Sequence, residues 1–311
     1  MDPLWKRVEA MCGEEPRVLA WGLLPLPDKM PHADLLTSWL ASGFHADMEW
    51  MAKTQNLRMQ PQQFEPTAKS VLLVLWKSAA ALQPLDRAIS IRVAAYAQGE
   101  DYHLSLGGWL HRMAAELRKD DPMLVFRPFS DAQPVPEREL AQMAGLGWIG
   151  KNRMLIHSQL GSNFVLGGLL CNVAVEDAQI HPSAQNFCGS CTRCIEACPT
   201  HAIHSELGVD ARQCISATTI EHRGEFSAAQ AAGIGNWLFG CDICQSVCPW
   251  NHKQLAKDNA DPYWPVELEA WEHLLTPGNG LKSRIKGTPL ERAGRKLLAR
   301  NLVAVSTNLC R

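Results

Sequence analysis

The spacing of the cysteines constrains this chain more than any other feature. Eleven cysteines occur among 311 residues, and eight of them lie between positions 188 and 248. The first run has the pattern C-x2-C-x2-C-x3-C-P and consists of Cys188, Cys191, Cys194 and Cys198, followed by Pro199. In bacterial ferredoxins this spacing lets three thiolates bind one [4Fe-4S] cluster while the fourth reaches a second cluster. The run therefore predicts iron–sulfur clusters rather than the disulfides of small secreted proteins.

A second run completes the ligand count. Cys241, Cys244 and Cys248 precede Pro249 and lack one cysteine of the same pattern, which Cys214 can supply. We expect the runs to cross over, with one cluster on Cys188, Cys191, Cys194 and Cys248 and the other on Cys198, Cys214, Cys241 and Cys244. Zinc is the alternative, because CxxC pairs also bind zinc, but two CxxxCP endings fit ferredoxin crossing better. No role is assigned to Cys12, Cys171 and Cys310, since free cysteines are commonly small buried apolar residues.

Nothing in the sequence indicates a membrane or export. The first ten residues, MDPLWKRVEA, contain no apolar segment typical of a signal peptide, and the aliphatic run at residues 71–76 is far shorter than a bilayer span. A hydrophobic content of 46% with 20% charged residues is ordinary for a globular protein. We expect a soluble cytoplasmic protein without membrane contact.

The chain divides into three parts by composition. Residues 1–180 alternate strand-like and helical segments, which predicts an α+β fold with strands near 17–26, 70–76, 123–129 and 164–175 and helices near 35–53 and 104–118. A polar stretch at 176–186 resembles a linker. The ferredoxin-like part is expected at 181–258 and a short helical segment at 259–311. Because a ferredoxin needs only the middle part, the first should house a second redox centre or a substrate site.

The C-terminal segment carries a local basic patch, although the whole chain has a net charge of -2. From residue 281 on, one acid, Glu291, accompanies eight basic residues: Lys282, Arg284, Lys286, Arg292, Arg295, Lys296, Arg300 and Arg311. Thr288, Pro289 and Glu291 form a helix-start signature. The helix should bury Leu290, Leu297, Leu298, Leu302 and Val305 and leave its basic residues outside.

Longer motifs resemble one family. The strings GEDYHLSL, SDAQPVPERELAQMAGLGWIGKN, CGSCTRCIEACPTHAI, DARQCISATTIEHRGEF and FGCDICQSVCPWN together are similar to epoxyqueuosine reductase, which is distantly related to reductive dehalogenases. The resemblance implies cobalamin, as cob(II)alamin, held between a nitroreductase-like α/β domain and the ferredoxin module. It also implies two-electron reduction of an epoxide to an alkene, giving queuosine at the wobble position of tRNA.

The resemblance also assigns roles to individual residues. Asp131 occupies the position of the family's proton donor, and we expect its site to raise its pKa toward neutrality; the alternative is a turn residue. The predicted cobalamin contacts are Arg58, Asp131, Gly150, Lys151, Asn152, Ser216 and Asp242, of which Gly150 to Asn152 end a Gly-rich turn that begins at Gly145 and Gly147. Tyr102 and His103 are expected either to line the pocket or to belong to the core.

Two departures from the family and two competing functions remain. The chain has Asp131-Ala132-Gln133-Pro134 where members often have aspartate-threonine-glycine or aspartate-serine-alanine, and it stops where many members continue into a helical-repeat domain. We expect tRNA to dock on Arg292, Arg295, Lys296 and Arg300, a flavodoxin or ferredoxin system to donate electrons, and the protein to be a monomer. The alternatives are a corrinoid reductase of small molecules, similar to a dehalogenase, or an electron-carrier module.

Overall fold

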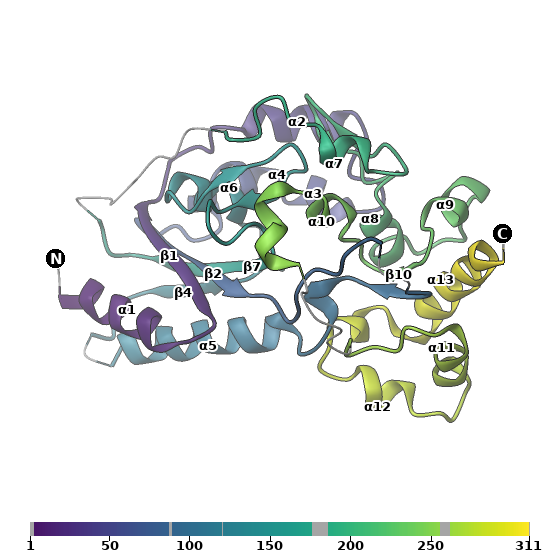
Figure 1. The fold of residues 1–311 in the computed structure, drawn as a ribbon. Coiled ribbons are helices and arrows are strands. Elements are labelled where there is room, and N and C mark those ends of the chain that lie inside the picture. The colour runs from purple at the N-terminus through teal and green to yellow at the C-terminus, as the bar shows by residue number, and fades with distance from the viewer. Residues whose placement is uncertain (1–2, 87–88, 120, 176–185, 256–261, 311) are drawn as a thin grey trace.

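The main sheet lies in the N-terminal part of the molecule (Figure 1). The computed structural model describes residues 3–86, 89–119, 121–175, 186–255 and 262–310. Four antiparallel strands have the order β1-β2-β7-β4. They are β1 (Val18–Pro25), β2 (Ser70–Lys77), β7 (Phe164–Cys171) and β4 (Phe126–Phe129). Each coincides with one of the four segments predicted as strands, β2 extending one residue beyond its segment, so the α+β fold is confirmed.

The sheet is covered by helices on both faces. In β2, every residue from Ser70 to Trp76 is buried, which explains its unbroken apolar sequence. Helices α1 (Pro3–Glu14) and α5 (Tyr102–Leu117) pack on one face, where Figure 1 shows them along the lower side of the sheet. Helix α6 (Glu137–Met143) packs on the other face. The short strands β5 (Trp148–Ile149) and β6 (Leu155–Ile156) follow α6 as a hairpin.

The helix predicted at 35–53 is interrupted. The structure has α2 (Ala33–Ala41), α3 (Glu49–Lys53), α4 (Gln55–Met59) and the 3-10 turn η1 (Pro61–Gln63). Gly43 (φ 67°) and Ala46 (φ 50°) are left-handed, a conformation that ends a helix. The loop between α2 and α3 contacts the C-terminal half, where the carbonyl of Phe44 accepts a hydrogen bond from the N–H of Ala211.

The cysteine-rich part is built from short elements around its two cysteine runs. Helix α7 (Arg193–Glu196) lies in the first run and α10 (Ile243–Ser246) in the second, and the two helices contact each other. The other elements are β8 (Ile203–His204), β9 (Gly208–Val209), α8 (Ile215–Ile220), α9 (Ala228–Gly233), β10 (Trp237–Phe239) and η3 (Pro249–Gln254).

Besides the apolar cores on the two faces of the main sheet, a third core joins segments that are distant in sequence. Strand β3 (Arg92–Val93), next to η2 (Ala95–Ala97), pairs in parallel with β10. The apolar core around this pair includes Ile91 and Phe239 together with Trp271 and Leu298 from the C-terminal segment. That segment contains α11 (Leu268–Leu275), α12 (Leu281–Ile285), η4 (Pro289–Arg292) and α13 (Gly294–Leu309). The domain boundaries expected at 180/181 and 258/259 lie outside the described residues.

The C-terminal helix begins later than predicted. Residues Pro289–Arg292 form the 3-10 turn η4, and α13 starts at Gly294, whose φ of 62° separates the two. The five apolar positions predicted to face inward are all buried: Leu290, Leu297, Leu298, Leu302 and Val305. Among the described residues, no helix combines the length and the apolar character that a membrane span requires.

Candidate active site

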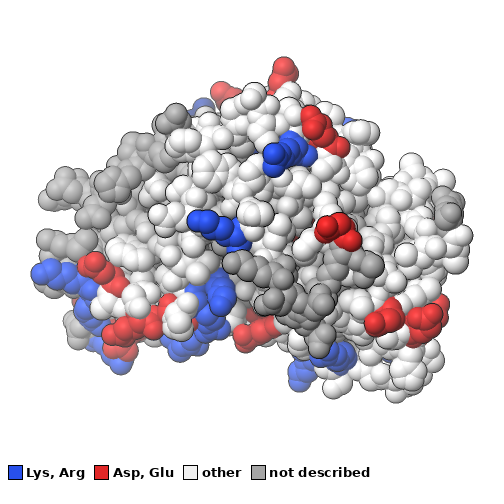
Figure 2. All heavy atoms as spheres, viewed as in Figure 1, with Lys and Arg blue, Asp and Glu red and all other residues white. Residues whose placement is uncertain are grey.

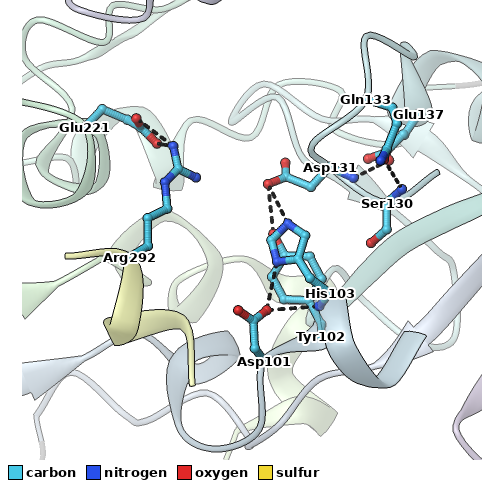
Figure 3. A network of polar contacts seen from close by, with 9 residues as sticks. All are labelled: Asp101, Tyr102, His103, Ser130, Asp131, Gln133, Glu137, Glu221 and Arg292. Carbon is cyan, nitrogen blue, oxygen red and sulfur yellow. Dashed lines mark hydrogen bonds and ion pairs between the residues drawn. The ribbon is translucent and has the colours of Figure 1, made fainter. Parts of the chain in front are cut away.

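Asp131 lies in the loop that follows β4 and meets the first turn of α5. Tyr102 Oη donates a 2.9 Å hydrogen bond to Asp131 Oδ2, and His103 Nε2 lies 3.6 Å from the same oxygen, at ion-pair distance (Figure 3). Asp101, the N-cap of α5, accepts a hydrogen bond from His103 N, and its Oδ1 lies 2.7 Å from His103 Nδ1. The structure thus brings Tyr102 and His103 to the predicted proton donor.

The electrostatics of this network differ from the expectation. Burial acts to raise the pKa of Asp131, but hydrogen bonds with His103 and Tyr102 and the positive charges of His103 and Arg292 lower it below its ordinary value. The predicted rise toward neutrality is therefore wrong. The contacts of His103 with Asp101 and Asp131, of which that with Asp101 has the larger effect, raise the pKa of His103 to about 9. Near neutral pH the pair is a carboxylate and an imidazolium, and the proton resides on His103.

Arg292 forms the opposite wall of the site. Figure 3 shows it pointing toward the same space as Asp131, with its Nη2 2.8 and 2.9 Å from the two carboxylate oxygens of Glu221. Arg292 belongs to η4 and Glu221 follows α8. The site therefore includes side chains from the N-terminal part, the cysteine-rich part and the C-terminal segment.

Glu221 also lines a cavity of about 400 Å³ between the loop at 43–48 and α8. Asp47 and His222 meet in its lining, with 2.6 Å between Oδ2 and Nδ1. Of the buried polar atoms that lack a hydrogen-bond partner within the described part of the chain, two lie here: Nδ1 of His45, which lines the cavity, and Oγ of Ser130 beside Asp131. Open space with unsatisfied polar atoms is compatible with a bound organic cofactor.

Arg58 lies close to the Asp131 loop. It lies in the last turn of α4, where its Nε donates to Thr54 Oγ1 at 3.1 Å and its guanidinium stacks over Trp50. Burial lowers the pKa of Arg58, whereas the negative charges of Glu137 and Asp131 act in the opposite direction. Arg58 is thus available at the edge of the site, as its predicted role requires.

The Gly-rich turn contacts both cysteine runs. Lys151 Nζ donates to the carbonyls of Gly189 and Cys191 at 2.8 and 3.0 Å, and Asn152 Nδ2 donates to the carbonyl of Cys244 at 3.3 Å. A Cβ on Gly150 would lie 2.5 Å from Cδ1 of Ile156, so a larger residue there would have to displace the side chain of Ile156. The described contacts of these three predicted cofactor residues are with protein groups.

The other two predicted cofactor contacts lie near cluster cysteines. Ser216 is in the first turn of α8, and its backbone N–H points to the thiol of Cys214. Asp242 is buried, accepts a 2.8 Å hydrogen bond from the N–H of Ala95, and has a pKa that burial raises to about 7. Asp242 therefore joins the cysteine-rich part to the N-terminal part.

The thiols raise one another's pKa values within the two predicted sets, and in one case across them, since Cys194 of the first set also acts on Cys244 of the second. Burial raises the pKa of Cys194, and the other three thiols of the first predicted set raise it further. Burial also raises the pKa of Cys241, to which Cys244 and Cys214 of the second set contribute. The charge of Cys198 likewise acts on Cys214. No three Cys, His, Asp or Glu side chains of the described residues lie close enough together to bind one metal ion. That these eight thiols bind two [4Fe-4S] clusters remains a prediction from their spacing.

Three of the four residues predicted to bind tRNA are engaged within the chain. Arg292 pairs with Glu221, and Arg295 donates to the carbonyl of Leu275. Arg300 donates to the carbonyls of His222 and Gly224 at 2.7 Å and stacks on Phe226. Lys296 is exposed. On the face shown in Figure 2, apart from the residues drawn in grey, basic and acidic groups alternate along the lower edge.

Sequence reasoning missed the residues that hold Asp131 and His103. Glu137 Oε1 accepts a 2.6 Å hydrogen bond from the N–H of Asp131, and Gln133 Oε1 accepts one of 2.8 Å from the N–H of Ser130. Asp101 could have been recognised as an N-cap before an amphipathic helix. No pattern in the sequence relates Glu221 to Arg292.

Comparison with known proteins identifies the family. A family model for a 4Fe-4S double cluster binding domain matches residues 187–251, and one for epoxyqueuosine reductase QueG, DUF1730, matches residues 58–132. The epoxyqueuosine reductase of Vibrio cholerae is 34% identical over 296 residues, covering 90% of this chain and 77% of that protein. That of Synechococcus is 38% identical over 275 residues, covering 86% and 83%.

Solved structures of such reductases have the same fold. A crystal structure of epoxyqueuosine reductase with an epoxyqueuosine-modified tRNA-Tyr stem loop aligns with 98% of this chain and 80% of its own, with a TM-score of 0.80 and 25% identity. A Bacillus subtilis structure, with its catalytic aspartate loop swung out of the active site, aligns with a TM-score of 0.79 and 25% identity, covering 98% and 82%. Clusters rather than zinc are the cofactors of the cysteine-rich part. This chain belongs to the epoxyqueuosine reductase family.

Proposed function

We propose that this protein reduces epoxyqueuosine to queuosine in tRNA, using cobalamin and two [4Fe-4S] clusters. The observation that carries the proposal is the Asp131–Tyr102–His103 network, which lies in a chain whose cysteine-rich part matches a double-cluster domain. A relative of the same fold has been crystallised with an epoxyqueuosine-modified stem loop.

The reaction needs two electrons and two protons. The epoxide loses its oxygen as water, and an alkene remains. When bound, cobalamin supplies a cobalt centre that can transfer electrons to the substrate, fed through the clusters. The cobalamin is proposed to lie between the N-terminal and cysteine-rich parts, with Arg58, Ser216 and Asp242 at its edge. The residues Gly150, Lys151 and Asn152 hold the cysteine runs against it.

The chain's own residues handle the protons. His103 stores one proton close to the site, because Asp101 and Asp131 stabilise its charged form. Tyr102 Oη donates to the carboxylate of Asp131. Asp131 receives a proton from this network and gives it to the departing oxygen, and solvent supplies the second proton that completes the water molecule. Asp131 thus acts as the general acid without a raised pKa of its own.

The proposal also covers the domains, the tRNA-docking surface and the electron donor. The proposed domains are 1–180 for cobalamin, 181–258 for the clusters and 259–311 for the basic segment. Because three of its predicted partners are engaged internally, tRNA should dock mainly through the exposed Lys296, with the exposed Lys282 and Lys286 of the same segment. We propose a cytoplasmic monomer that receives electrons from a flavodoxin or ferredoxin.

The test is turnover of the anaerobically reconstituted protein on epoxyqueuosine-containing tRNA. Asp131→Asn should lose about 10²- to 10⁴-fold in kcat, the usual contribution of a general acid, and should still bind cobalamin and iron. Asp34→Asn is a matched control, since its side chain is 98% exposed, and should leave kcat unchanged. Unchanged turnover in Asp131→Asn would make Asp131 a structural turn residue. A wild-type protein that binds iron but no cobalamin would indicate an electron carrier.

A further inference from the structure

The loop that carries Asp131 is held at two successive backbone amides. Glu137 Oε1 accepts from the N–H of Asp131 at 2.6 Å, and Gln133 Oε1 accepts from the N–H of Ser130 at 2.8 Å (Figure 3). Asp131 itself is left-handed, with φ 59°, a conformation that costs free energy in a residue other than glycine. Such a conformation persists only where surrounding contacts impose it.

The contacts that hold the loop are made by its backbone, whereas the functional partners of Asp131 contact its side chain. Its carboxylate points to Tyr102 and His103 on α5, whereas its amide points to Glu137 at the start of α6. Glu137 is only half-buried, yet it lies among three charged groups, Asp131, Arg138 and Arg58. An acceptor here satisfies an amide that would otherwise lack a partner in the left-handed turn.

Gln133 supplies the second bond to the loop, beside the one from Glu137. A glycine or alanine at this position would have no side-chain acceptor to offer, so the bond depends on the identity of this residue.

We propose that Glu137 and Gln133 are positioning residues that clamp the Asp131 loop so that its carboxylate faces Tyr102 and His103. The proposal rests on the proposed function, because the clamp acts on the proton donor of that reaction. Neither residue contacts the carboxylate of Asp131. Their effect is on how often the donor lies in its working position, and a shift of ~1 Å in a reacting group can cost about 10²-fold in rate.

The clamp contains a group that can change charge. Burial and the negative charge of Asp131 raise the pKa of Glu137 to about 8, whereas the amide of Asp131, Arg138 and Arg58 act to lower it. An ionised acceptor binds an N–H more strongly than a neutral one. The clamp should therefore tighten as pH rises through about 8, and kcat should rise over the same range.

The first measurement is hydrogen exchange of the backbone amides in the reconstituted protein, which needs no substrate. Glu137→Ala should accelerate exchange at Asp131, and Gln133→Ala should accelerate it at Ser130. The matched control is Glu139→Ala on the same helix, because Glu139 Oε1 accepts from the N–H of His32 in a different loop. It should accelerate exchange at His32 and leave Ser130 and Asp131 unchanged.

The second measurement is steady-state kinetics against pH. Glu137→Ala should lose about tenfold to a hundredfold in kcat with little change in KM. Glu137→Gln keeps an acceptor and should retain more activity than Glu137→Ala, but its kcat should lack the rise near pH 8. Gln133→Ala should change kcat in the same direction by a smaller factor, and it serves as the test if Glu137→Ala does not fold.

The outcomes separate the clamp from the proposed reaction. Unchanged exchange at Ser130 and Asp131 in both alanine variants would overturn the clamp, whatever the protein reduces. Loss of turnover with unchanged exchange would also overturn it, by making Glu137 a participant in the chemistry. If exchange accelerates as expected but the wild-type protein does not reduce epoxyqueuosine, the clamp stands and the proposed function fails.

Discussion

Replacing His103 by alanine tests whether this histidine is the proton store of the site. In the wild-type protein its pKa is raised to about 9 by Asp101 and Asp131. The ordinary value is about 6.5, and each unit corresponds to about 1.4 kcal/mol, so the full shift would represent roughly 3 kcal/mol. Because 34% of the His103 side chain is exposed, solvent screening reduces this to roughly 1–2 kcal/mol of stability.

The pH dependence of this contribution has a definite sign. The folded-state pKa is higher than the unfolded one, so the stabilisation is fully present below about pH 6.5 and is lost as pH rises through about 9. The wild-type protein should therefore be more stable than His103→Ala at pH 6, and the two should converge near pH 10. Thermal unfolding under anaerobic conditions at both pH values measures the difference.

Steady-state kinetics and NMR spectroscopy of His103→Ala test the role of the proton on His103. Without His103, kcat should fall by roughly 10²-fold or more, and the decline of kcat/KM that we expect near pH 9 in the wild type should disappear. One imidazole resonance that titrates near pH 9 should be missing from the NMR spectrum of the variant. If the missing resonance instead titrates near 6.5, the reasoning about Asp101 and Asp131 is refuted.

Three further predictions concern the clusters, the packing and tRNA. Cys214→Ser should halve the iron content from about eight atoms per chain, measured by iron and sulfide analysis, because only the second set includes this thiol; full iron content would reject the assignment. Gly161→Ala should destabilise the protein by at least ~2 kcal/mol in thermal unfolding, because φ is 66° and the added Cβ would lie 2.0 Å from Asn251 Oδ1. Gly13→Ala in α1, with nothing within 4 Å of its Cβ, is the matched control and should show no loss. Lys296→Glu should weaken tRNA binding and reduce its salt slope by about 1 without altering stability, whereas Arg300→Glu should lower the unfolding temperature because three carbonyls lose their donor; equal unfolding temperatures would contradict the internal role of Arg300.

The sequence predicted which segments form strands and helices better than it predicted where the helices begin and end. The strands β2 and β7 were recognisable because they are almost continuously apolar. The helix expected at 35–53 is broken because Gly43 and Ala46 take up left-handed conformations, which apolar periodicity does not reveal. The cap signature at Thr288 failed similarly, since Gly294 separates the first turn from α13.

The candidate site was predictable only in part for the same reason. The double-cluster domain was predictable because the spacing within each cysteine run is a local property, whereas the division of the cysteines into two sets stays a prediction. The role of Asp131 came from resemblance, and its lowered pKa depends on His103 and Arg292, which are far from it in sequence. Arg300 was placed outside by its helical position, but its long side chain reaches back to Phe226.

The pairing of β3 with β10 determines when the protein can finish folding during synthesis. Ile91 and Val93 emerge from the ribosome long before Trp237 and Phe239, which cover them in the finished molecule. At about 5–20 residues per second, the delay is on the order of ten seconds. A nascent chain, or a fragment cut before the cysteine-rich part, leaves this apolar edge uncovered and prone to aggregation.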